Sequence, residues 1–266
     1  MTPAAMRGVL ALAVAMVAAC GPASPPARLA PSPTSAMIRV GTSPDAPPTS
    51  FIRNGRITGI EPDFAQALAD QLRRPVQLVP MRWDELIPSL LRGNIDIIMS
   101  GMTVTRARQV RVAFGDPYLQ SGLVAVVRRD SASKYSTLDA IREAPANVGI
   151  RTNSTAAQWV RDNLRYATVV PYPNLEDAAR ELAQGRLDMF VTDIPIAAWM
   201  VSQHEGDLQL VRIRLTHEDI AWAFRPNDTQ LLAAANGALA RWRQDGTLRT
   251  ILRRWLPYLS DLESWR

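Results

Sequence analysis

Asp96-Ile-Ile-Met-Ser100-Gly-Met-Thr103-Val-Thr105-Arg-Ala-Arg108 is the most informative stretch of this 266-residue chain. Its apolar start predicts a short strand buried on both faces, because such a strand needs no polar alternation. The strand is expected to end at Ser100-Gly101. Thr105 is typical of a residue that caps a helix, which places Arg108 near the third helical position. Hydroxyls, free amides and a guanidinium therefore gather at the carboxyl end of a strand.

This combination suits a small carboxylate, since a guanidinium offers a planar pair of donors and a helix N-terminus attracts anions. The same spacing also fits an ordinary strand, a turn and a solvent-facing arginine. The stretch by itself leaves both an anion site and a purely structural loop open.

The rest of the chain alternates short apolar segments with amphipathic ones. Strands that alternate with helices predict a mostly parallel sheet with helices on both faces, and hence an α/β fold. We expect strands over 38–40, 76–79, 95–99, 122–127, 147–150, 168–170, 189–191, 208–211 and 220–224, and helices that open near 60, 84, 137, 155, 175, 195, 229 and 247.

An internal repeat relates two parts of this alternation. Residues 93–101 and 185–193 both begin with Gly, carry Asp three positions later, and place a hydroxyl residue four positions after that. Ligands bind at the carboxyl ends of strands in open α/β sheets. Two facing lobes would therefore set Ser100, Thr103 and Arg108 opposite Asp193. A cation facing an anion matches a zwitterion, of which an α-amino acid is the simplest, although repeated α/β units also arise from packing alone.

The N-terminus has the pattern of a targeting segment. A positive charge at Arg7 precedes an apolar run from Val9 to Ala19, which is too short to span a membrane as a mature helix. Val17-Ala-Ala-Cys20 resembles a bacterial lipoprotein signal, so we expect a signal peptide over 1–19 and a lipidated Cys20. A Pro- and Ser-rich segment then predicts a disordered tether over 20–36. The alternative is an ordinary secretory signal with an incidental cysteine.

Composition argues against several classes of function. The chain has 30 basic and 25 acidic residues, but its arginines are scattered and not interleaved with aromatic residues, so no nucleic-acid partner is expected. A single cysteine allows no disulfide within one molecule. The two histidines, His204 and His217, lack the spacing of metal ligands or of a hydrolase triad, so neither a metal nor a cofactor is expected.

The chain resembles the family 3 extracellular solute-binding proteins, the amino-acid receptors of ABC importers, from Ile38 to Tyr258. The order and spacing of several short motifs carry the resemblance. These motifs are Gly59-Ile-Glu-Pro-Asp-Phe-Ala, Trp83 through Gly93, Asp96 through Arg108, Phe114-Gly-Asp-Pro-Tyr118, Gly185 through Asp193, and Asp245-Gly-Thr-Leu with Trp255.

The resemblance implies a two-lobed fold of the periplasmic-binding-protein type. Each lobe would hold a mostly parallel sheet flanked by helices, and two hinge strands near 120–123 and 219–223 would join the lobes. We expect lobe 1 over 37–121 and 222–266 and lobe 2 over 122–221, closing around the ligand.

The resemblance also implies roles for individual residues. Arg108 would clamp the ligand α-carboxylate with help from the Thr103 hydroxyl, and the Gly101 backbone and Asp193 would take the α-ammonium. The remaining expected ligand-binding residues are Ser100 beside Gly101, Ser154 and Thr155 as donors from lobe 2, and Trp83 as a pocket-lining residue.

Two regions depart from the family pattern. The first turn usually carries aromatic residues, but here Ala46 and Thr49 stand at those positions, and Phe51 is either a substitute or a core residue. In the lobe 2 loop, Arg151 and Asn153 replace residues that are commonly uncharged or Gly. An added cation in a wider pocket would favour a larger or acidic ligand, whereas a solvent-facing Arg151 would have no such effect.

An enzyme of the same fold is the alternative. Cyclohexadienyl dehydratases resemble this chain around Val191-Thr-Asp193, but Ile196 stands where they carry a catalytic Glu, and a general acid must lie within hydrogen-bond reach of its substrate. A receptor sensor domain would need a membrane helix downstream. We therefore expect a monomeric, extracytoplasmic binding lipoprotein, anchored through Cys20, that is not an enzyme and passes an amino-acid-like ligand to an ABC permease.

Overall fold

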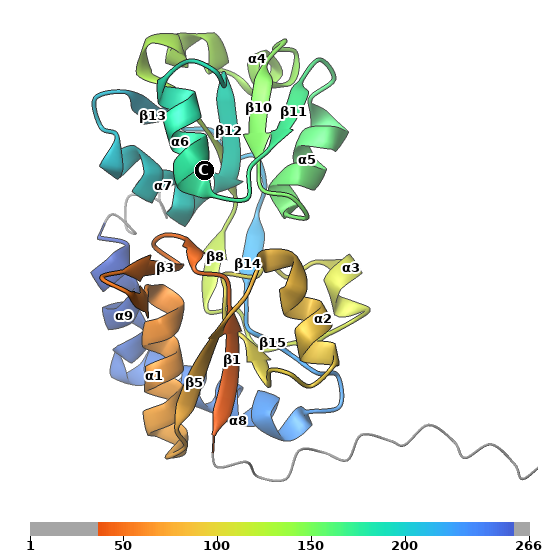
Figure 1. The fold of residues 1–266 in the computed structure, drawn as a ribbon, viewed down its shortest axis with the longest axis vertical. Helices are drawn as coiled ribbons and strands as arrows, with labels where there is room; N and C mark the ends of the chain where they lie inside the picture. The colour runs from red at the N-terminus through yellow and green to blue at the C-terminus, as the bar shows by residue number, and fades with distance from the viewer. Residues whose placement is uncertain (1–36, 258–266) are drawn as a thin grey trace, which may run out of the picture. The chain divides into compact units, whose positions relative to one another are not determined.

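The computed structural model describes residues 37–257, and these all lie in one compact unit. The expected signal peptide over 1–19, Cys20 and the tether to residue 36 lie outside the described residues. The predicted α/β fold with two helix-flanked sheets is confirmed (Figure 1).

The first sheet has three neighbouring parallel strands. Two further strands follow at one edge, and each pairs antiparallel with the strand before it. Its order is β5 (Val76–Pro80), β1 (Ile38–Thr42), β6 (Ile97–Ile98), β15 (Ala223–Phe224) and β7 (Ala113–Phe114). The helices of this part of the chain are α1 (Ile60–Leu72), the 3-10 helix η1 (Trp83–Glu85), α2 (Leu86–Leu91), α3 (Arg106–Gln109), α8 (Thr229–Asp245) and α9 (Thr247–Trp255).

The second sheet repeats this plan, with parallel neighbours followed by antiparallel ones. Its order is β11 (Thr168–Pro171), β10 (Asn147–Ile150), β12 (Met189–Asp193), β9 (Leu123–Arg128) and β13 (Leu208–Leu210). Its helices are the 3-10 helix η2 (Arg129–Tyr135), α4 (Leu138–Arg142), α5 (Thr155–Asn163), α6 (Leu175–Ala183) and α7 (Ile194–Gln203).

The two halves of the sequence repeat take the same place in the two sheets. β6 is the central strand of the first sheet, between β1 and β15, and β12 is the central strand of the second sheet, between β10 and β9. Both strands are buried, which is why each reads as an apolar run in the sequence. Their carboxyl ends lead to Ser100 and to Asp193, the residues that begin the two halves of the candidate site.

Two short antiparallel strands connect the sheets. β8 (Leu119–Ser121) pairs with β14 (Glu218–Ile220), in the region where the hinge was expected. The single strand predicted over 220–224 is wrong: β14 ends at Ile220, and the chain enters the first sheet as β15 at Ala223. The apolar run over 220–224 is therefore divided between two sheets, and the hydrophobicity of the residues does not show where the division lies.

A hairpin sheet absent from the sequence prediction follows β1. It consists of β2 (Asp45–Ala46), β3 (Ser50–Arg53) and β4 (Arg56–Thr58). Asn54 and Gly55 turn the chain between β3 and β4, both with positive φ, as hairpin turns require. This hairpin precedes α1 directly and brings Asp45 and Phe51 toward residues of the second sheet's helices and loops.

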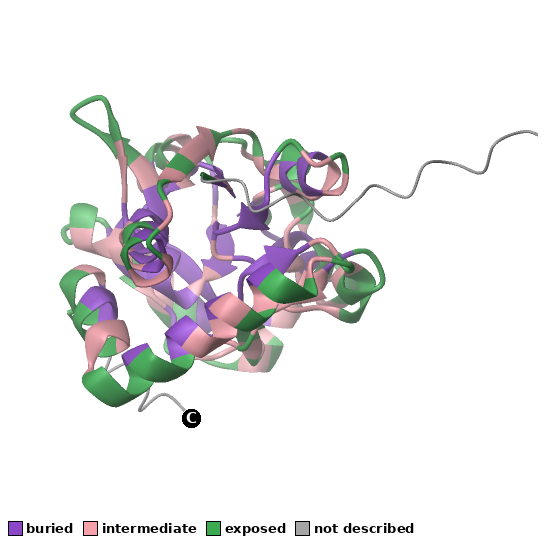
Figure 2. Cartoon of the chain, turned by 90° about the horizontal axis from the view of Figure 1, so that it is seen from below, coloured by how far each residue is buried: buried purple, intermediate pink, exposed green. Residues whose placement is uncertain are grey.

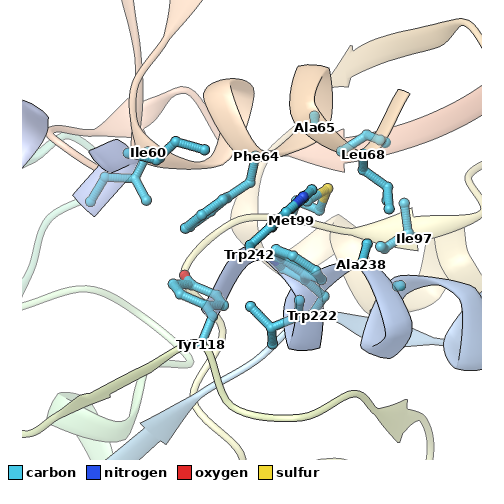
Figure 3. Packing of buried hydrophobic residues seen from close by; sticks show 14 of the residues in the cluster. Ile60, Phe64, Ala65, Leu68, Ile97, Met99, Tyr118, Trp222, Ala238 and Trp242 are labelled. Atoms are coloured by element: carbon cyan, nitrogen blue, oxygen red, sulfur yellow. The ribbon is translucent and has the colours of Figure 1, made fainter. Parts of the chain in front are cut away.

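The core beside the first sheet is rich in aromatic rings. Phe64 of α1 is fully buried and packs against Tyr118, Trp222 and Trp242, with ring centroids 5.1 to 6.0 Å apart (Figure 3). Separate apolar clusters cover the two faces of the second sheet. Figure 2 shows the buried residues concentrated in the sheets, with exposed residues on the outer sides of the helices.

Candidate functional site

The loop after β6 begins with Ser100 and Gly101. Ser100 is buried, and its hydroxyl accepts a hydrogen bond from the Ser43 amide at 3.0 Å, so it ties β6 to the loop after β1. Gly101 has φ 66°, and a Cβ there would lie 2.8 Å from Thr49 Cγ2. Both the positive φ and this close approach require glycine.

Thr103 and Arg108 lie next to each other, as the sequence predicted. Thr105 caps α3 by accepting a hydrogen bond from the Arg108 amide, which confirms the predicted cap. The Arg108 side chain turns back, and its Nη1 donates to the Thr103 carbonyl at 2.8 Å. Burial lowers the pKa of Arg108, and the nearby carboxylates of Asp193 and Glu218 oppose that shift. The Arg108 guanidinium therefore stays positively charged and is attracted to the carboxylates of Asp193 and Glu218.

Asp193 ends β12 in the second sheet. Its Oδ1 is enclosed and has no hydrogen-bond partner within residues 37–257. No ion pair within 4.0 Å joins it to Arg108 among the described residues, although the two charges influence each other. Burial raises the pKa of Asp193 to about 7, Glu218 adds to the rise, and Arg108 opposes it. An enclosed carboxylate oxygen without a donor is costly, and a bound ammonium would supply the missing donor.

Glu218 is a second carboxylate near Arg108 that the sequence analysis missed. Its Oε2 accepts hydrogen bonds from the hydroxyls of Thr103 at 2.8 Å and Thr155 at 3.1 Å, and its Oε1 accepts one from Thr216 at 3.0 Å. Glu218 begins the strand β14 that connects the two sheets, so it binds hydroxyls from both of them. Its place at the start of an expected hinge strand was the only signal in the sequence.

Glu61, in the first turn of α1, is a third acid that was not singled out. It is fully buried and accepts hydrogen bonds from the Gly101 amide at 2.6 Å, the Tyr118 hydroxyl at 2.7 Å and the Trp222 indole at 3.0 Å. Burial raises the pKa of Glu61 to about 7, against these hydrogen bonds. Glu61 thereby fixes the Gly101 loop to the aromatic core.

The loop after β10 supplies the residues expected from lobe 2. Ser154 caps α5 by accepting a hydrogen bond from the Ala157 amide, and its hydroxyl donates to the Arg151 carbonyl at 2.6 Å. Thr155 is the first residue of α5, and the first-turn amides of any helix lack partners inside it. Asn153 has φ 58°, a conformation that asparagine tolerates better than most residues. Its carbonyl accepts from the Trp83 indole and from Arg108.

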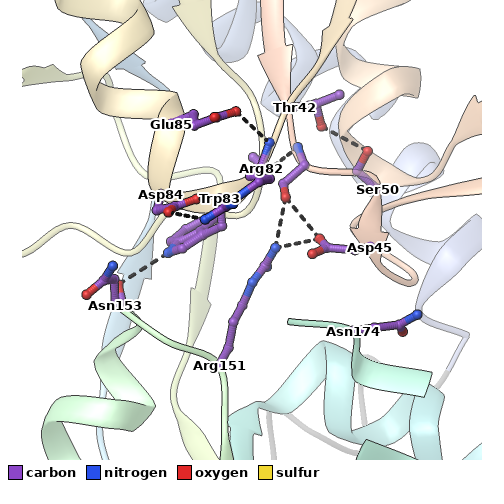
Figure 4. Close-up of polar contacts among 12 residues, drawn as sticks. Thr42, Asp45, Ser50, Arg82, Trp83, Asp84, Glu85, Arg151, Asn153 and Asn174 are labelled. Carbon is purple, nitrogen blue, oxygen red and sulfur yellow. Dashed lines mark hydrogen bonds and ion pairs between the residues drawn. The ribbon is translucent and has the colours of Figure 1, made fainter. Parts of the chain in front are cut away.

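Arg151 does not face solvent, which corrects one of the two alternatives for this residue. Its side chain is 11% exposed, and its Nη2 binds Asp45 Oδ1 at 2.5 Å and Ser43 Oγ at 2.9 Å (Figure 4). The Trp83 ring lies between two guanidiniums, with the Arg151 carbon 4.8 Å and the Arg108 carbon 5.3 Å from its centroid. The helix expected to open near residue 84 begins as η1 at Trp83, and the Asp84 carboxylate does not cap it, because it binds Arg82.

Phe51 does not join this charged group. It packs on Trp199 at 5.4 Å and on Trp255 at 5.7 Å. Phe51, Trp199 and Ile196 line a separate cavity of about 430 Å³, whose lining also includes Pro47 and Met200. Of the other first-turn residues, Ala46 packs among apolar residues of the second sheet, and Thr49 lies against Gly101. The aromatic ring that contacts Arg108 and Arg151 is Trp83, which comes from η1 and not from the first turn.

Two surveys cover the described residues only. Within residues 37–257, no cluster of three or more His, Cys, Asp or Glu side chains is arranged to hold a metal ion. No helix in the same range has the length and apolar character needed to span a bilayer.

Comparison with known proteins gives a consistent family. Residues 38–258 match the model of the bacterial extracellular solute-binding proteins, family 3. The L-cystine-binding protein TcyJ of Escherichia coli is 30% identical over 219 residues, which cover 82% of each chain. The cyclohexadienyl dehydratase of Pseudomonas aeruginosa is 27% identical over 226 residues, or 84% of each chain.

A solved structure supports the same fold. The ancestral amino acid-binding protein AncCDT-1, described as a precursor of cyclohexadienyl dehydratase, superposes with a TM-score of 0.78 and 35% identity. The match covers 84% of this chain and 96% of that protein. The two-lobed fold of the sequence analysis is thereby confirmed.

Proposed function

The chain belongs to the bacterial extracellular solute-binding proteins of family 3, and from that membership we propose that it captures a small amino-acid-like zwitterion for an ABC permease. The enclosed, unpartnered Oδ1 of Asp193 carries this proposal. Asp193 has one carboxylate oxygen without a donor at the end of β12, and it attracts the Arg108 guanidinium of α3 without forming an ion pair. These two groups fit the two charges of an α-amino acid. The curated relative that binds L-cystine belongs to the same chemical class.

In this proposal, Arg108 binds the ligand α-carboxylate together with the first-turn amides at Thr155. The Thr103 hydroxyl, which donates to Glu218 in the structure, turns to the carboxylate when the ligand binds. Asp193 binds the α-ammonium with the Gly101 carbonyl. Ser100 and Ser154 act through the backbone, because their hydroxyls already hold Ser43 and the start of α5. Trp83 covers the ligand from one side.

We place lobe 1 over 37–121 and 222–266 and lobe 2 over 122–221, with β8 and β14 as the hinge. In favour of this division, all five strands of each large sheet fall within one lobe, and the β8–β14 pair joins the two lobes. The ligand would bind between the lobes and favour the closed arrangement.

The first experiment is a thermal-shift screen of the purified protein over amino acids, opines and small carboxylates, because a ligand that binds only the folded state raises the melting temperature. Isothermal titration then compares the parent with Arg108→Ala. Loss of one partner of a buried charge pair costs about 2–5 kcal/mol, so the affinity should fall about 30-fold or more. The control is Arg106→Ala, an exposed arginine of the same helix, which should bind like the parent. Equal affinity of Arg108→Ala and the parent would contradict the assignment.

We also propose that the protein is a monomeric lipoprotein held at the membrane through Cys20. The support is the segment Val17-Ala-Ala-Cys20 after an apolar run. Expressed in bacteria, the full chain should partition into the detergent phase of Triton X-114. Cys20→Ser should shift to the aqueous phase if lipid provides the anchor, and equal partitioning of both proteins would refute the lipidation.

Enzymatic activity is the competing proposal, because a dehydratase shares the family. Against it stands Ile196, which is buried in an apolar cluster and lines the Phe51 cavity instead of the Arg108 and Asp193 site. Proton donation to a leaving hydroxyl needs an acid within hydrogen-bond reach. Incubation with prephenate should give no product; turnover without any response to amino acids would favour the enzyme.

A further inference from the structure

Arg151 joins the loop after β10 to the loop after β1. Its side chain is nearly buried and passes from one sheet's loop to Ser43 and Asp45 on the other (Figure 4). Burial lowers the pKa of Arg151, and the neighbouring carboxylates, Asp45 foremost, oppose that shift. The chain thus places a second cation beside the proposed ligand site, in addition to Arg108.

The partners of Arg151 are the ones that a ligand cation would need. A positively charged side chain entering a protein site is bound by a carboxylate and by the face of an aromatic ring. Here Asp45 is the carboxylate and Trp83 is the ring, and the protein's own guanidinium already occupies both, at 2.5 Å and 4.8 Å. A ligand with a guanidinium or ammonium on its side chain would find these partners taken and would meet a like charge.

Arg151 also retains donors for an anion. Within the described part of the chain, its hydrogen bonds all use Nη2, so Nη1 and Nε remain available. A cavity of about 320 Å³ lies at this guanidinium, and its lining includes Asp45, Trp83, Asn153 and Tyr172. Asp45 likewise uses one carboxylate oxygen for Arg151 and for Ser43, which leaves Oδ2 free of described partners.

We propose that the ligand carries a second carboxylate at the end of its side chain, and that Arg151 binds it. This inference rests on the proposed function, since Arg108 and Asp193 must hold the amino-acid end. Two kinds of molecule share this chemistry. One is an acidic amino acid, whose side chain ends in a bare carboxylate. The other is a two-headed amino acid such as cystine, whose second ammonium would face Asp45 Oδ2.

The test is isothermal titration of the full chain with isosteric pairs, because an affinity ratio is insensitive to a partly inactive preparation. Glutamate is compared with glutamine, and cystine with S-methylthiocysteine, which lacks the second amino-acid end. In the pair that contains the preferred ligand, the parent should bind the member with the second carboxylate at least about 30-fold more tightly than the member without it. Arginine and lysine should bind more weakly than that ligand.

Arg151→Met removes the charge and keeps the apolar stem. In this variant the ratio of affinities within the preferred ligand pair should fall toward one. Free arginine should bind more tightly than it binds the parent, because Asp45 and Trp83 become available to its side chain. The matched control is Arg186→Ala, an exposed arginine that pairs with Glu181 away from the site, which should keep the ratios of the parent. Asp45→Asn separates the two sources, since it should weaken cystine and leave the glutamate-to-glutamine ratio above one.

Two results would overturn the inference while leaving the proposed function in place. One is a parent protein that prefers arginine, lysine or glutamine, with binding still lost in Arg108→Ala. The other is an Arg151→Met variant with unchanged ratios. If no amino acid binds the parent, the proposed function itself fails, and the inference fails with it.

Discussion

Asp193 and Arg108 approach each other from different sheets, yet the described ion pairs within 4.0 Å do not join them. Folded proteins seldom leave an enclosed carboxylate oxygen without a donor. The three hydroxyls around Glu218 show that this region can satisfy an acid when it has the residues to do so. This contrast supports the proposal that a ligand supplies the donor that Asp193 Oδ1 lacks.

The pKa of Asp193 makes ligand affinity depend on pH. Burial raises the pKa of the free carboxyl to about 7, and a bound ammonium would lower it again. The acid must then lose its proton for the complex to form, so affinity is constant above about pH 7 and falls as the pH drops below it, by up to about tenfold per unit. The α-ammonium of an amino acid stays charged throughout this range. Titrations between pH 5 and 8 should show this fall, and Asp193→Asn should flatten it; a parent with pH-independent affinity would contradict the proposed role of Asp193.

At the scale of elements, the sequence predicted the strands and helices that depend on neighbouring residues. Thr105 caps α3, and the apolar runs predicted as strands over 95–99 and 189–191 contain the buried strands β6 and most of β12. The hairpin from Asp45 to Thr58 was not predicted, because its short strands carry too few apolar residues to show a period of two.

Glu61 and Glu218 show why half of the site could not be predicted. Glu61 binds Gly101, Tyr118 and Trp222, and Glu218 binds Thr103 and Thr155, so their partners lie 40 to 161 residues away in the sequence. Local patterns record caps and periodicity but not which distant donor meets which acid. The opening stretch and its internal repeat pointed to Arg108 and Asp193, and the family resemblance gave each a role toward the ligand. The pairing of Arg151 with Asp45 became visible only in the folded chain.

Two glycines allow a prediction about the elements that hold the site. Gly101→Ala should destabilise the protein by about 1–3 kcal/mol and weaken ligand binding, because its φ is 66° and the new methyl would lie 2.8 Å from Thr49 Cγ2. Gly237→Ala in α8 should instead stabilise the protein by about 0.5–1 kcal/mol, since nothing lies within 4 Å of its Cβ position and alanine favours a helix. Urea unfolding measures both. A neutral Gly101→Ala would show that the loop after β6 is more adaptable than its contacts indicate.

At the scale of the whole molecule, contacts between the two sheets fall into a charged group and an apolar group. Arg151 with Asp45 and Trp83 with Asn153 form the first, and Phe51 with Trp199 forms the second. Only the charged group lies beside Arg108. The apolar group is expected to favour lobe closure without recognising the ligand.

Phe51→Ala tests this division of roles. Aromatic pairs contribute about 0.5–1.5 kcal/mol beyond area burial, so the variant should weaken all ligands by a similar factor of about 2 to 12. The order of preference among ligands should stay that of the parent, as isothermal titration over the panel would show. A change in that order would mean that the Phe51 cavity takes part in recognition.

The measurement that tests the central claim most directly compares the best-binding amino acid with its deaminated carboxylic acid, in the parent and in Asp193→Asn. If Asp193 binds the α-ammonium while Arg108 holds the carboxylate, the parent should prefer the amino acid by about 100-fold, in line with the loss of a buried charge partner. Asp193→Asn should lose most of this preference and bind the deaminated acid about as well as the parent does. A preference that survives in Asp193→Asn unchanged would contradict the account.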